Sequence, residues 1–276
     1  MRSRARSPAR PFVFAVLAAL ALVACAAGPR SPAASGTGAA EPGEVTGQVA
    51  GELTVLAAAS LRPAFDELAA LLEREHPDLD VRPITYDGSS TLATQLVQGA
   101  PGDVFTAADQ RTMATVADAG LLAGAPTVVA RNTLRLVVLP DNPHTVRTPA
   151  DLTRADLQVV LCAAEVPCGA AARAWLDAAG VDLTPASEEQ NVTAVVTKVA
   201  AGEADAGLVW ASDVRSADGR VEAVEVPDAV TAASASAYPV AVLADAANPS
   251  AARAFIALAG SPTGQALLAR YGFTAP

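Results

Sequence analysis

Histidine is scarce in this sequence, and the motifs that accompany hydrolytic or zinc chemistry are absent. Only two of the 276 residues are histidines, His76 and His144, and each lies beside a proline. No G-x-S-x-G, H-E-x-x-H or metal-spaced cysteine pattern occurs, although these are local signatures of serine hydrolases, zinc proteases and zinc sites. A serine hydrolase using Ser60 or Ser89 stays open as an alternative. We nevertheless predict that the chain is not an enzyme and needs no cofactor.

Basic residues are also few. The chain has 19 Lys and Arg against 29 Asp and Glu, a formal charge of −10. Four of the arginines lie within the first 24 residues, which contain no acidic residue, and removing that segment leaves −14. Because so acidic a surface repels phosphate groups, nucleic acid is excluded as a partner.

An apolar run occupies residues 12–23 and follows Arg2, Arg4, Arg6 and Arg10. This order is typical of a secretory signal peptide, here residues 1–24, and the run is too short for a permanent membrane span. It ends in Leu22-Val23-Ala24-Cys25, which resembles the lipobox of bacterial lipoproteins. We predict export and lipidation of Cys25, with the protein in the periplasm or on the outer face of the cell membrane. An ordinary signal peptide with a chance cysteine is the alternative.

Residues 25–50 are rich in Ala, Gly, Ser and Pro without apolar periodicity, and we predict that after Cys25 they form a flexible tether. About 226 residues remain, enough for one large or two modest domains. They contain two cysteines, Cys162 and Cys168. In an oxidising compartment these two are expected to form a disulfide, with two buried thiols as the alternative.

Apolar runs typical of strands alternate with segments of helical periodicity in the remaining sequence. The expected strands are 53–59, 81–86, 104–105, 134–139, 158–162, 206–210 and 239–243. The expected helices are 61–72, 91–98, 110–119, 169–179, 192–201, 251–259 and 262–271. This alternation predicts an α/β fold with a mostly parallel sheet.

Four strand-to-helix turns carry small or hydroxyl residues at the expected helix start: Ser60, 88–90, 168–169 and 191–192. Helix N-termini combine unpaired N–H groups with the positive end of the helix dipole, which favours an oxyanion. In an open α/β sheet such turns gather at the carboxyl ends of the strands. Simple N-capping explains each turn taken alone. Since no Lys or Arg adjoins Ser60, Ser89 or Val192, neutral donors would hold the anion.

Carboxylates close to these turns are expected to stay off the ligand. Asp87 directly precedes Gly88, and we expect its side chain to point away from an anion. Asp103 and Asp109 are expected to cap turns and helices, and Asp213 is expected to be structural.

Motifs distributed from Leu53 onward resemble those of the periplasmic molybdate-binding proteins. They are the segments 57–61, 88–92, 99–105, 108–109, 166–169, 191–192, 207–213, 238–242 and 270–273. The resemblance implies a type II periplasmic binding protein, with two α/β lobes and a ligand cleft between them. Lobe one would comprise 51–131 plus 239–276, and lobe two 132–238.

The same resemblance implies the ligand contacts. The hydroxyls and amides of Ser60 and Ser89 would donate from lobe one, and the amides of Cys168 and Val192 from lobe two. The fifth family ligand is a tyrosine hydroxyl, but Trp210 stands at that position and offers an indole N–H of different reach.

The function implied is capture of molybdate or tungstate for an ABC importer. Its partners would be the importer permease and, through the lipid anchor, the membrane, with the protein itself a monomer. A lipoprotein that binds sulfate, phosphate or a small carboxylate on the same scaffold is the alternative.

Overall fold

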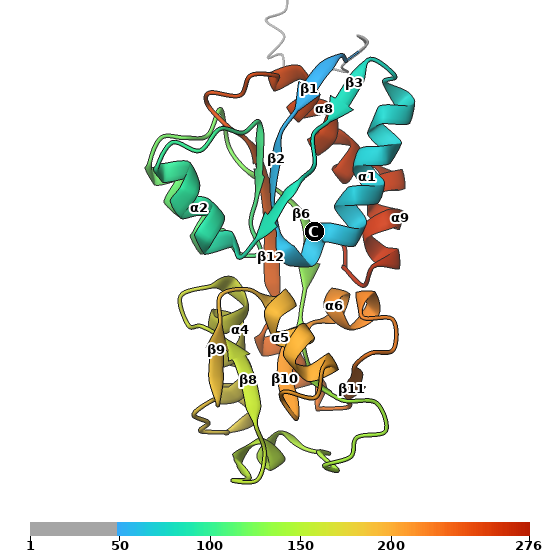
Figure 1. Ribbon diagram of the computed structural model, residues 1–276. Coiled ribbons are helices and arrows are strands. Elements are labelled where there is room, and N and C mark those ends of the chain that lie inside the picture. Colours follow the sequence, from blue (N-terminus) through green and yellow to red (C-terminus); the bar gives the residue numbers. More distant parts are fainter. Residues whose placement is uncertain (1–48) are drawn as a thin grey trace, which may run out of the picture. The chain divides into compact units, whose positions relative to one another are not determined.

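The computed structural model describes residues 49–276. The predicted signal peptide, the lipidation site Cys25 and nearly all of the tether lie outside the described residues. Within 49–276 the chain forms two five-stranded sheets and one two-stranded sheet, arranged as two α/β lobes (Figure 1). None of the helices in this part of the chain has both the length and the apolar character needed to cross a membrane.

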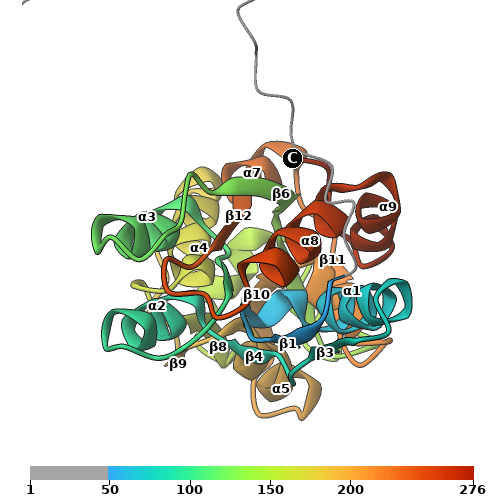
Figure 2. The same ribbon diagram turned by 90° about the horizontal axis from the view of Figure 1, so that it is seen from above.

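Lobe one is built on the sheet with strand order β4-β2-β5-β12-β6. Its strands are β2 (Val55–Ala58), β4 (Thr85–Asp87), β5 (Val104–Thr106), β6 (Thr127–Asn132) and β12 (Ser236–Val242), and β1 (Gly51–Leu53) pairs with β3 (Leu79–Val81) beside it. Its helices are α1 (Arg62–Glu75), α2 (Ser89–Val97), α3 (Gln110–Asp118), α8 (Pro249–Gly260) and α9 (Pro262–Arg270), with the short 3-10 helix η1 (Ala59–Leu61) after β2. Helices α1, α8 and α9 pack together on one side and α2 with α3 on the other (Figure 2).

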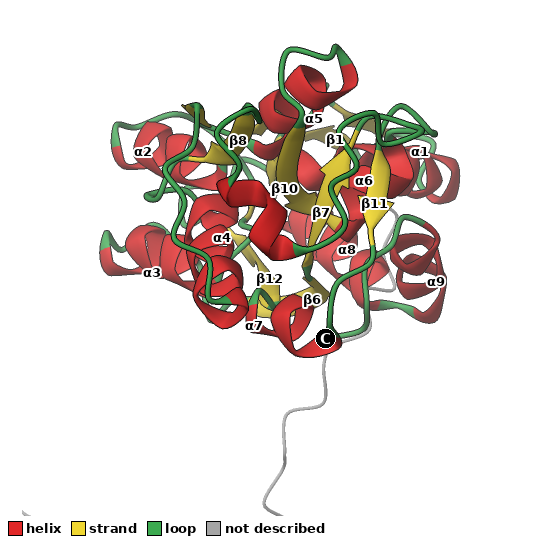
Figure 3. Ribbon diagram, turned by 90° about the horizontal axis from the view of Figure 1, so that it is seen from below, coloured by secondary structure: helices red, strands yellow, loops and turns green. Residues whose placement is uncertain are grey.

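Lobe two is built on the sheet with strand order β11-β7-β10-β8-β9. Its strands are β7 (Leu134–Val138), β8 (Val159–Cys162), β9 (Ser187–Glu189), β10 (Ala206–Trp210) and β11 (Glu222–Val224). Its helices are α4 (Pro167–Ala179), α5 (Val192–Ala200), α6 (Ala211–Ser216) and α7 (Asp228–Ala233), with the 3-10 helix η2 (Pro149–Thr153). Helix α5 packs on one face of this sheet, and α4 with α7 on the other (Figure 3).

The chain passes between the lobes along two neighbouring strands. Strand β6 ends at Asn132 and β7 begins two residues later, while β12 returns from lobe two soon after α7. The two crossing strands are antiparallel, with Ser236 opposite Asn132 and Tyr238 opposite Ala130. The connection between the lobes is therefore a paired two-stranded ribbon.

The sheets differ from the expected, mostly parallel arrangement. Strands β6 and β12 of lobe one, and β7 and β11 of lobe two, pair antiparallel with their neighbours, so both large sheets are mixed. The single strand expected over 81–86 is also wrong. Pro83 lies between β3 and β4, and because proline has no N–H to donate, it interrupts the ladder.

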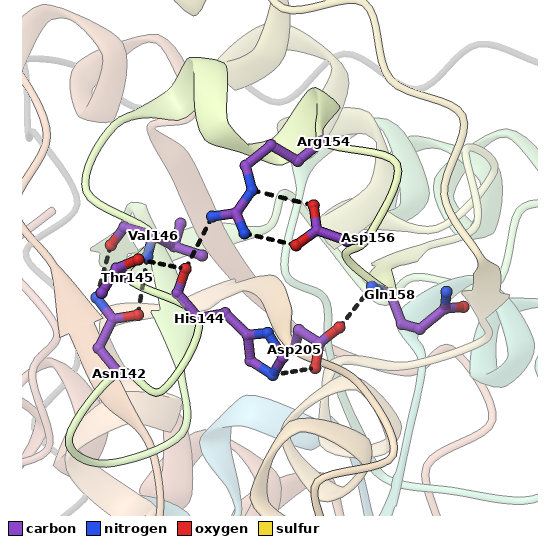
Figure 4. A network of polar contacts seen from close by, with 8 residues as sticks. All are labelled: Asn142, His144, Thr145, Val146, Arg154, Asp156, Gln158 and Asp205. Atoms are coloured by element: carbon purple, nitrogen blue, oxygen red, sulfur yellow. Dashed lines mark hydrogen bonds and ion pairs between the residues drawn. The ribbon is translucent and has the colours of Figure 1, made fainter.

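A polar network holds the long loop between β7 and β8 (Figure 4). His144 Nε2 lies 3.0 Å from Asp205 Oδ1, and Asp205 Oδ2 accepts the Gln158 N–H at 2.7 Å. Arg154 donates to the His144 carbonyl at 2.8 Å and pairs with Asp156. These groups join the loop to the start of β10, and His144 therefore has a structural role.

Candidate functional site

The four turns singled out in the sequence surround one cavity. Its lining comprises Ala58, Ala59, Ser60, Asp87, Gly88, Ser89, Ala108, Val166, Pro167, Cys168, Asn191, Val192 and Trp210. The cavity volume of about 20 Å³ exceeds the roughly 10 to 15 Å³ that one water requires. Both lobes therefore contribute residues to one small cavity.

Lobe one contributes two buried serines. Ser60 lies in η1 and is 3% exposed, and its Oγ is 3.0 Å from the Tyr238 hydroxyl. Ser89 is the first residue of α2, is 2% exposed, and its Oγ accepts the Ala108 N–H at 3.0 Å. Each serine thus has a hydroxyl at the cavity and an N–H in a first helical turn, where helix geometry leaves N–H groups without an intrahelical acceptor.

Lobe two contributes the starts of α4 and α5. Cys168 is the second residue of α4 and Val192 the first of α5. The Asn191 side chain caps α5 by accepting the Ala194 N–H at 3.0 Å. Since both N–H groups belong to first turns, the helix dipoles and amides of lobe two face the same cavity as those of lobe one.

A disulfide links Cys162 at the end of β8 to Cys168, with their Cα atoms 5.6 Å apart. It closes the short turn that carries the Cys168 amide. The next residue, Gly169, cannot be replaced without movement, because a Cβ there would lie 1.8 Å from the Ala163 carbonyl oxygen. The turn is thus fixed both by a covalent bond and by close backbone packing.

Trp210 ends β10 and lines the cavity, and its side chain is almost fully buried. Its indole packs edge-on against the Tyr238 ring, with centroids 5.9 Å apart. Its backbone N–H donates to Asp213 Oδ2 at 3.2 Å. The tryptophan therefore closes the cavity wall and connects it to two buried polar side chains.

Asp87 is one of the residues around the cavity, and its carboxylate has two hydrogen-bond donors beside it. It lines the cavity, and its Oδ1 accepts from the Gly88 N–H at 2.7 Å and from Asn191 Nδ2 at 3.0 Å. Asn191 belongs to lobe two, so the carboxylate bridges the lobes. Its charge is compensated by donors beside it, which the sequence did not reveal because Asn191 is 104 residues away.

Other contacts between the lobes show that the cleft is closed. The Ser90 hydroxyl and Arg111 Nη2 both donate to the Glu165 carbonyl oxygen at 2.9 Å. Gly88 approaches lobe two so closely that a Cβ would lie 2.2 Å from the Gln190 carbonyl oxygen. The structure is accordingly the closed form of a two-lobed protein.

No lysine or arginine contributes to the cavity lining. Within residues 49–276, no three His, Cys, Asp or Glu side chains are grouped as a metal site would require. The two aspartates expected to cap turns and helices have structural partners: Asp103 accepts from Thr54 and Asn248, and Asp109 caps α3. The residues around the cavity therefore offer mainly neutral hydrogen-bond donors, and Asp87 is the one residue of the lining that carries a charge.

Tyr238 and Asn132 are polar residues near the site whose contacts sequence reasoning missed. Tyr238 is fully buried and contacts Ser60, and Asn132 is 2% exposed. Burial raises the pKa of the Tyr238 hydroxyl well above its usual range, and its polar contacts with Ser60 and Asn132 oppose that shift. In the sequence, only the motif that begins at Tyr238 singled out this segment. The motif did not indicate that Tyr238 contacts Ser60, which is 178 residues away.

Comparisons with known proteins agree with this geometry. The family model of the bacterial extracellular solute-binding proteins matches residues 53–274. The molybdate-binding protein ModA of Mycobacterium tuberculosis is 44% identical over 255 residues, covering 92% of this chain and 93% of that protein. The molybdate-binding protein ModA of Escherichia coli is 30% identical over 238 residues, covering 81% and 89%.

A solved structure supports the fold assignment. The periplasmic molybdate-binding protein of Azotobacter vinelandii superposes with a TM-score of 0.69 at 20% sequence identity, covering 81% of this chain and 99% of that one. At this identity the likeness concerns the fold alone. The family match, in contrast, spans nearly every described residue, and the chain belongs to the bacterial extracellular solute-binding proteins.

Proposed function

We propose that this protein binds a tetrahedral oxyanion, molybdate or tungstate, outside the cytoplasm and delivers it to the permease of an ABC importer. The observation that carries the proposal is the convergence of four helix starts, at Ser60, Ser89, Cys168 and Val192, on one cavity without a cationic side chain. The 44% identity to a protein named as molybdate-binding supports the choice of anion. Binding without catalysis and action as a monomer belong to the same proposal.

Neutral donors are sufficient for this task. Hydrogen bonds to a charged group contribute about 1.5 to 3 kcal/mol each, and micromolar affinity corresponds to about −8 kcal/mol. Four amides and two serine hydroxyls reach that range even though the chain carries a formal charge of −10. The donors are divided between lobe one (51–131 plus 239–276) and lobe two (132–238). An anion that contacts both lobes therefore stabilises the closed form by the contacts that it makes in the closed form and not in the open form.

The lipid anchor at Cys25 completes the proposal. A tether over 25–50 would keep the folded lobes close to a membrane-embedded importer at high effective concentration. Replacing Cys25 with serine should release the protein from the membrane fraction without changing anion affinity. Retention of the variant in that fraction would exclude this anchor.

Calorimetric titration of the purified protein with molybdate, tungstate, sulfate and phosphate tests the choice of ligand. We expect molybdate and tungstate to bind at micromolar concentration or below. Sulfate is smaller and should bind more weakly, because donors spaced for a larger ion are left imperfectly paired. Equal or tighter binding of sulfate would replace the proposed ligand with sulfate.

Ser89→Ala should weaken molybdate binding by about 1 to 3 kcal/mol, the range for loss of a hydrogen bond to a charged group. Ser216→Ala provides the matched control, because the Ser216 hydroxyl bonds only the Ser212 carbonyl one helical turn away and does not line the cavity. Its affinity should equal that of the wild type. An unchanged affinity in Ser89→Ala would remove Ser89 from the site.

A further inference from the structure

Two side chains of lobe one donate to a single backbone carbonyl of lobe two, beside the cavity. The Ser90 hydroxyl and Arg111 Nη2 each lie 2.9 Å from the Glu165 carbonyl oxygen. A carbonyl oxygen has two lone pairs, so these two donors fill its capacity. None of the three residues belongs to the cavity lining. The contact therefore joins the lobes without passing through the ligand space.

The Glu165 carbonyl belongs to the short loop that the Cys162–Cys168 disulfide closes. Within this loop the Val166 N–H donates to the Ala163 carbonyl at 3.1 Å, which folds the segment into a tight turn. The same loop carries the Cys168 amide at the start of α4, beside the cavity. One covalently closed loop thus has an N–H at the cavity and a carbonyl that contacts lobe one.

Both donors to this loop are placed by helix starts of lobe one. Ser90 is the second residue of α2, and Arg111 is the second residue of α3. Asp109 caps α3 by accepting the Thr112 N–H, and its Oδ2 lies 3.7 Å from Arg111 Nη2. The Arg111 side chain is 60% exposed, so water competes for its hydrogen bond and the contribution is modest. These donors reach lobe two only when the lobes are closed.

We infer that Arg111 and Ser90 form a latch on the disulfide-closed loop, and that this latch slows the release of a bound anion without contacting it. The inference rests on the proposed function, and it assigns two residues outside the cavity to the control of affinity. Both are positioning residues, because they act through the Glu165 carbonyl and the loop that carries the Cys168 amide.

The latch acts on release of the anion and not on its capture. The cavity lies between the lobes, so an anion enters and leaves it in the open form, where the Glu165 carbonyl and its two donors are apart. Contacts that exist only in the closed form stabilise that form and slow its opening. Loss of these contacts raises the dissociation rate and leaves the association rate unchanged, which is the usual pattern when related complexes differ in affinity.

Arg111→Gln and Ser90→Ala each remove one donor to the Glu165 carbonyl. Stopped-flow measurement of tryptophan fluorescence gives both rate constants for molybdate, since Trp210 lines the cavity. Each variant should release molybdate about three- to tenfold faster than the wild type, the scale of one hydrogen bond, with the association rate unchanged. Release of tungstate and sulfate should speed up by the same factor, because the latch does not contact the ion.

Arg62→Gln is the matched control for loss of a positive charge. Arg62 lies in the same lobe directly after η1, and its guanidinium lies 4.3 Å from the centre of the Tyr86 ring, also in lobe one. This variant should keep the wild-type release rate. Equal acceleration in Arg62→Gln, or slower association with unchanged release in Arg111→Gln, would mean that the arginine acts by long-range charge and would overturn the inference. Unchanged release in both Arg111→Gln and Ser90→Ala would overturn it as well.

Combined variants test the part of the disulfide in the latch. Replacing Cys162 and Cys168 with alanine should also speed release. Adding Arg111→Gln to that pair should have little further effect, because a loop that is no longer closed does not hold the Glu165 carbonyl toward lobe one. Residues that act through one shared element are non-additive in this way. Rate increases that simply multiply would contradict the assignment of the disulfide to the latch.

The choice of anion separates this inference from the proposed function. If the protein binds sulfate and not molybdate, the proposed ligand is wrong, whereas faster release of sulfate from Arg111→Gln still supports the latch. Tight molybdate binding with wild-type release rates in Arg111→Gln and Ser90→Ala supports the proposed function and overturns the latch. Binding of none of the anions contradicts both. Thermal unfolding without anion verifies that each variant is folded, and if one is not, the other decides.

Discussion

Asp213 is a carboxyl group buried behind the cavity wall. It is 8% exposed and accepts the backbone N–H of Trp210, which lines the cavity. Burial raises its pKa to about 7, and the hydrogen bond from Trp210 only partly offsets this. The charge of the Asp213 carboxyl group therefore depends on pH near neutrality. Only Trp210 separates this group from the cavity.

Asp213→Asn should change how stability depends on pH. The folded pKa of about 7 lies above the ordinary value of 3.8, so the native state binds the additional proton and the wild type loses stability as pH rises through 7. Asparagine can still accept the Trp210 N–H but does not titrate. Between about pH 5 and pH 8, the free energy of unfolding of the variant should improve relative to the wild type by roughly 2 to 3 kcal/mol. Parallel pH dependence of the two proteins in denaturant unfolding would contradict the shift.

At the scale of single elements, the site depends on where helices begin. Helices α2, α4 and α5 all start at the cavity, each directly after a short turn that follows a strand. The turn before α4 is the most constrained, because the disulfide and Gly169 hold it against β8. The position of the Cys168 amide is accordingly set by the turn and not by the cysteine side chain.

Replacing both Cys162 and Cys168 with alanine should destabilise the protein and weaken anion binding. For so short a loop, the chain-entropy model gives a stabilisation of about 2 kcal/mol. We expect molybdate affinity to fall several-fold, because the Cys168 amide would no longer be held in place before the ligand arrives. Calorimetry and denaturant unfolding measure the two effects, and wild-type protein reduced with dithiothreitol should match the variant. An unchanged affinity in both samples would show that Gly169 packing alone positions the turn.

At the scale of the whole folded region, binding and lobe closure depend on the same contacts. The Asp87–Asn191 hydrogen bond and the two donors to the Glu165 carbonyl cross between the lobes around the cavity. Gly88 permits this approach, since any side chain at that position would meet the Gln190 carbonyl. A ligand shifts such an equilibrium only by its differential affinity for the closed form.

Gly88→Ala should separate folding from closure. Gly88 has a φ of −57°, which alanine adopts without strain, and the added Cβ meets lobe two only in the closed form. Molybdate affinity should fall by about 100-fold, or about 3 kcal/mol, with the unfolding temperature of the anion-free protein unchanged. Small-angle X-ray scattering should show that molybdate compacts the wild type but not the variant. Gly124→Ala, at a position with no neighbour within 4 Å, is the control, and normal compaction of Gly88→Ala would contradict this role.

The sequence by itself determined the local features of this protein. Hydrophobic periodicity predicted most strands and helices to within a few residues, because it reflects which side of an element is buried. Small and hydroxyl residues marked the helix starts at Ser60, Ser89, Cys168 and Val192, since capping chemistry operates within one turn. The resemblance of motifs predicted the two-lobed fold, which the family and structural matches confirm.

Only the tertiary structure decided which of these features meet. It brought the four helix starts to one cavity, placed Asp87 in its lining, and set Tyr238 behind Ser60. It also made β6 and β12 an antiparallel ribbon between the lobes, where periodicity predicted no strand for β6. Contacts between residues more than a hundred positions apart depend on how completed elements pack, and packing leaves no local pattern in the sequence.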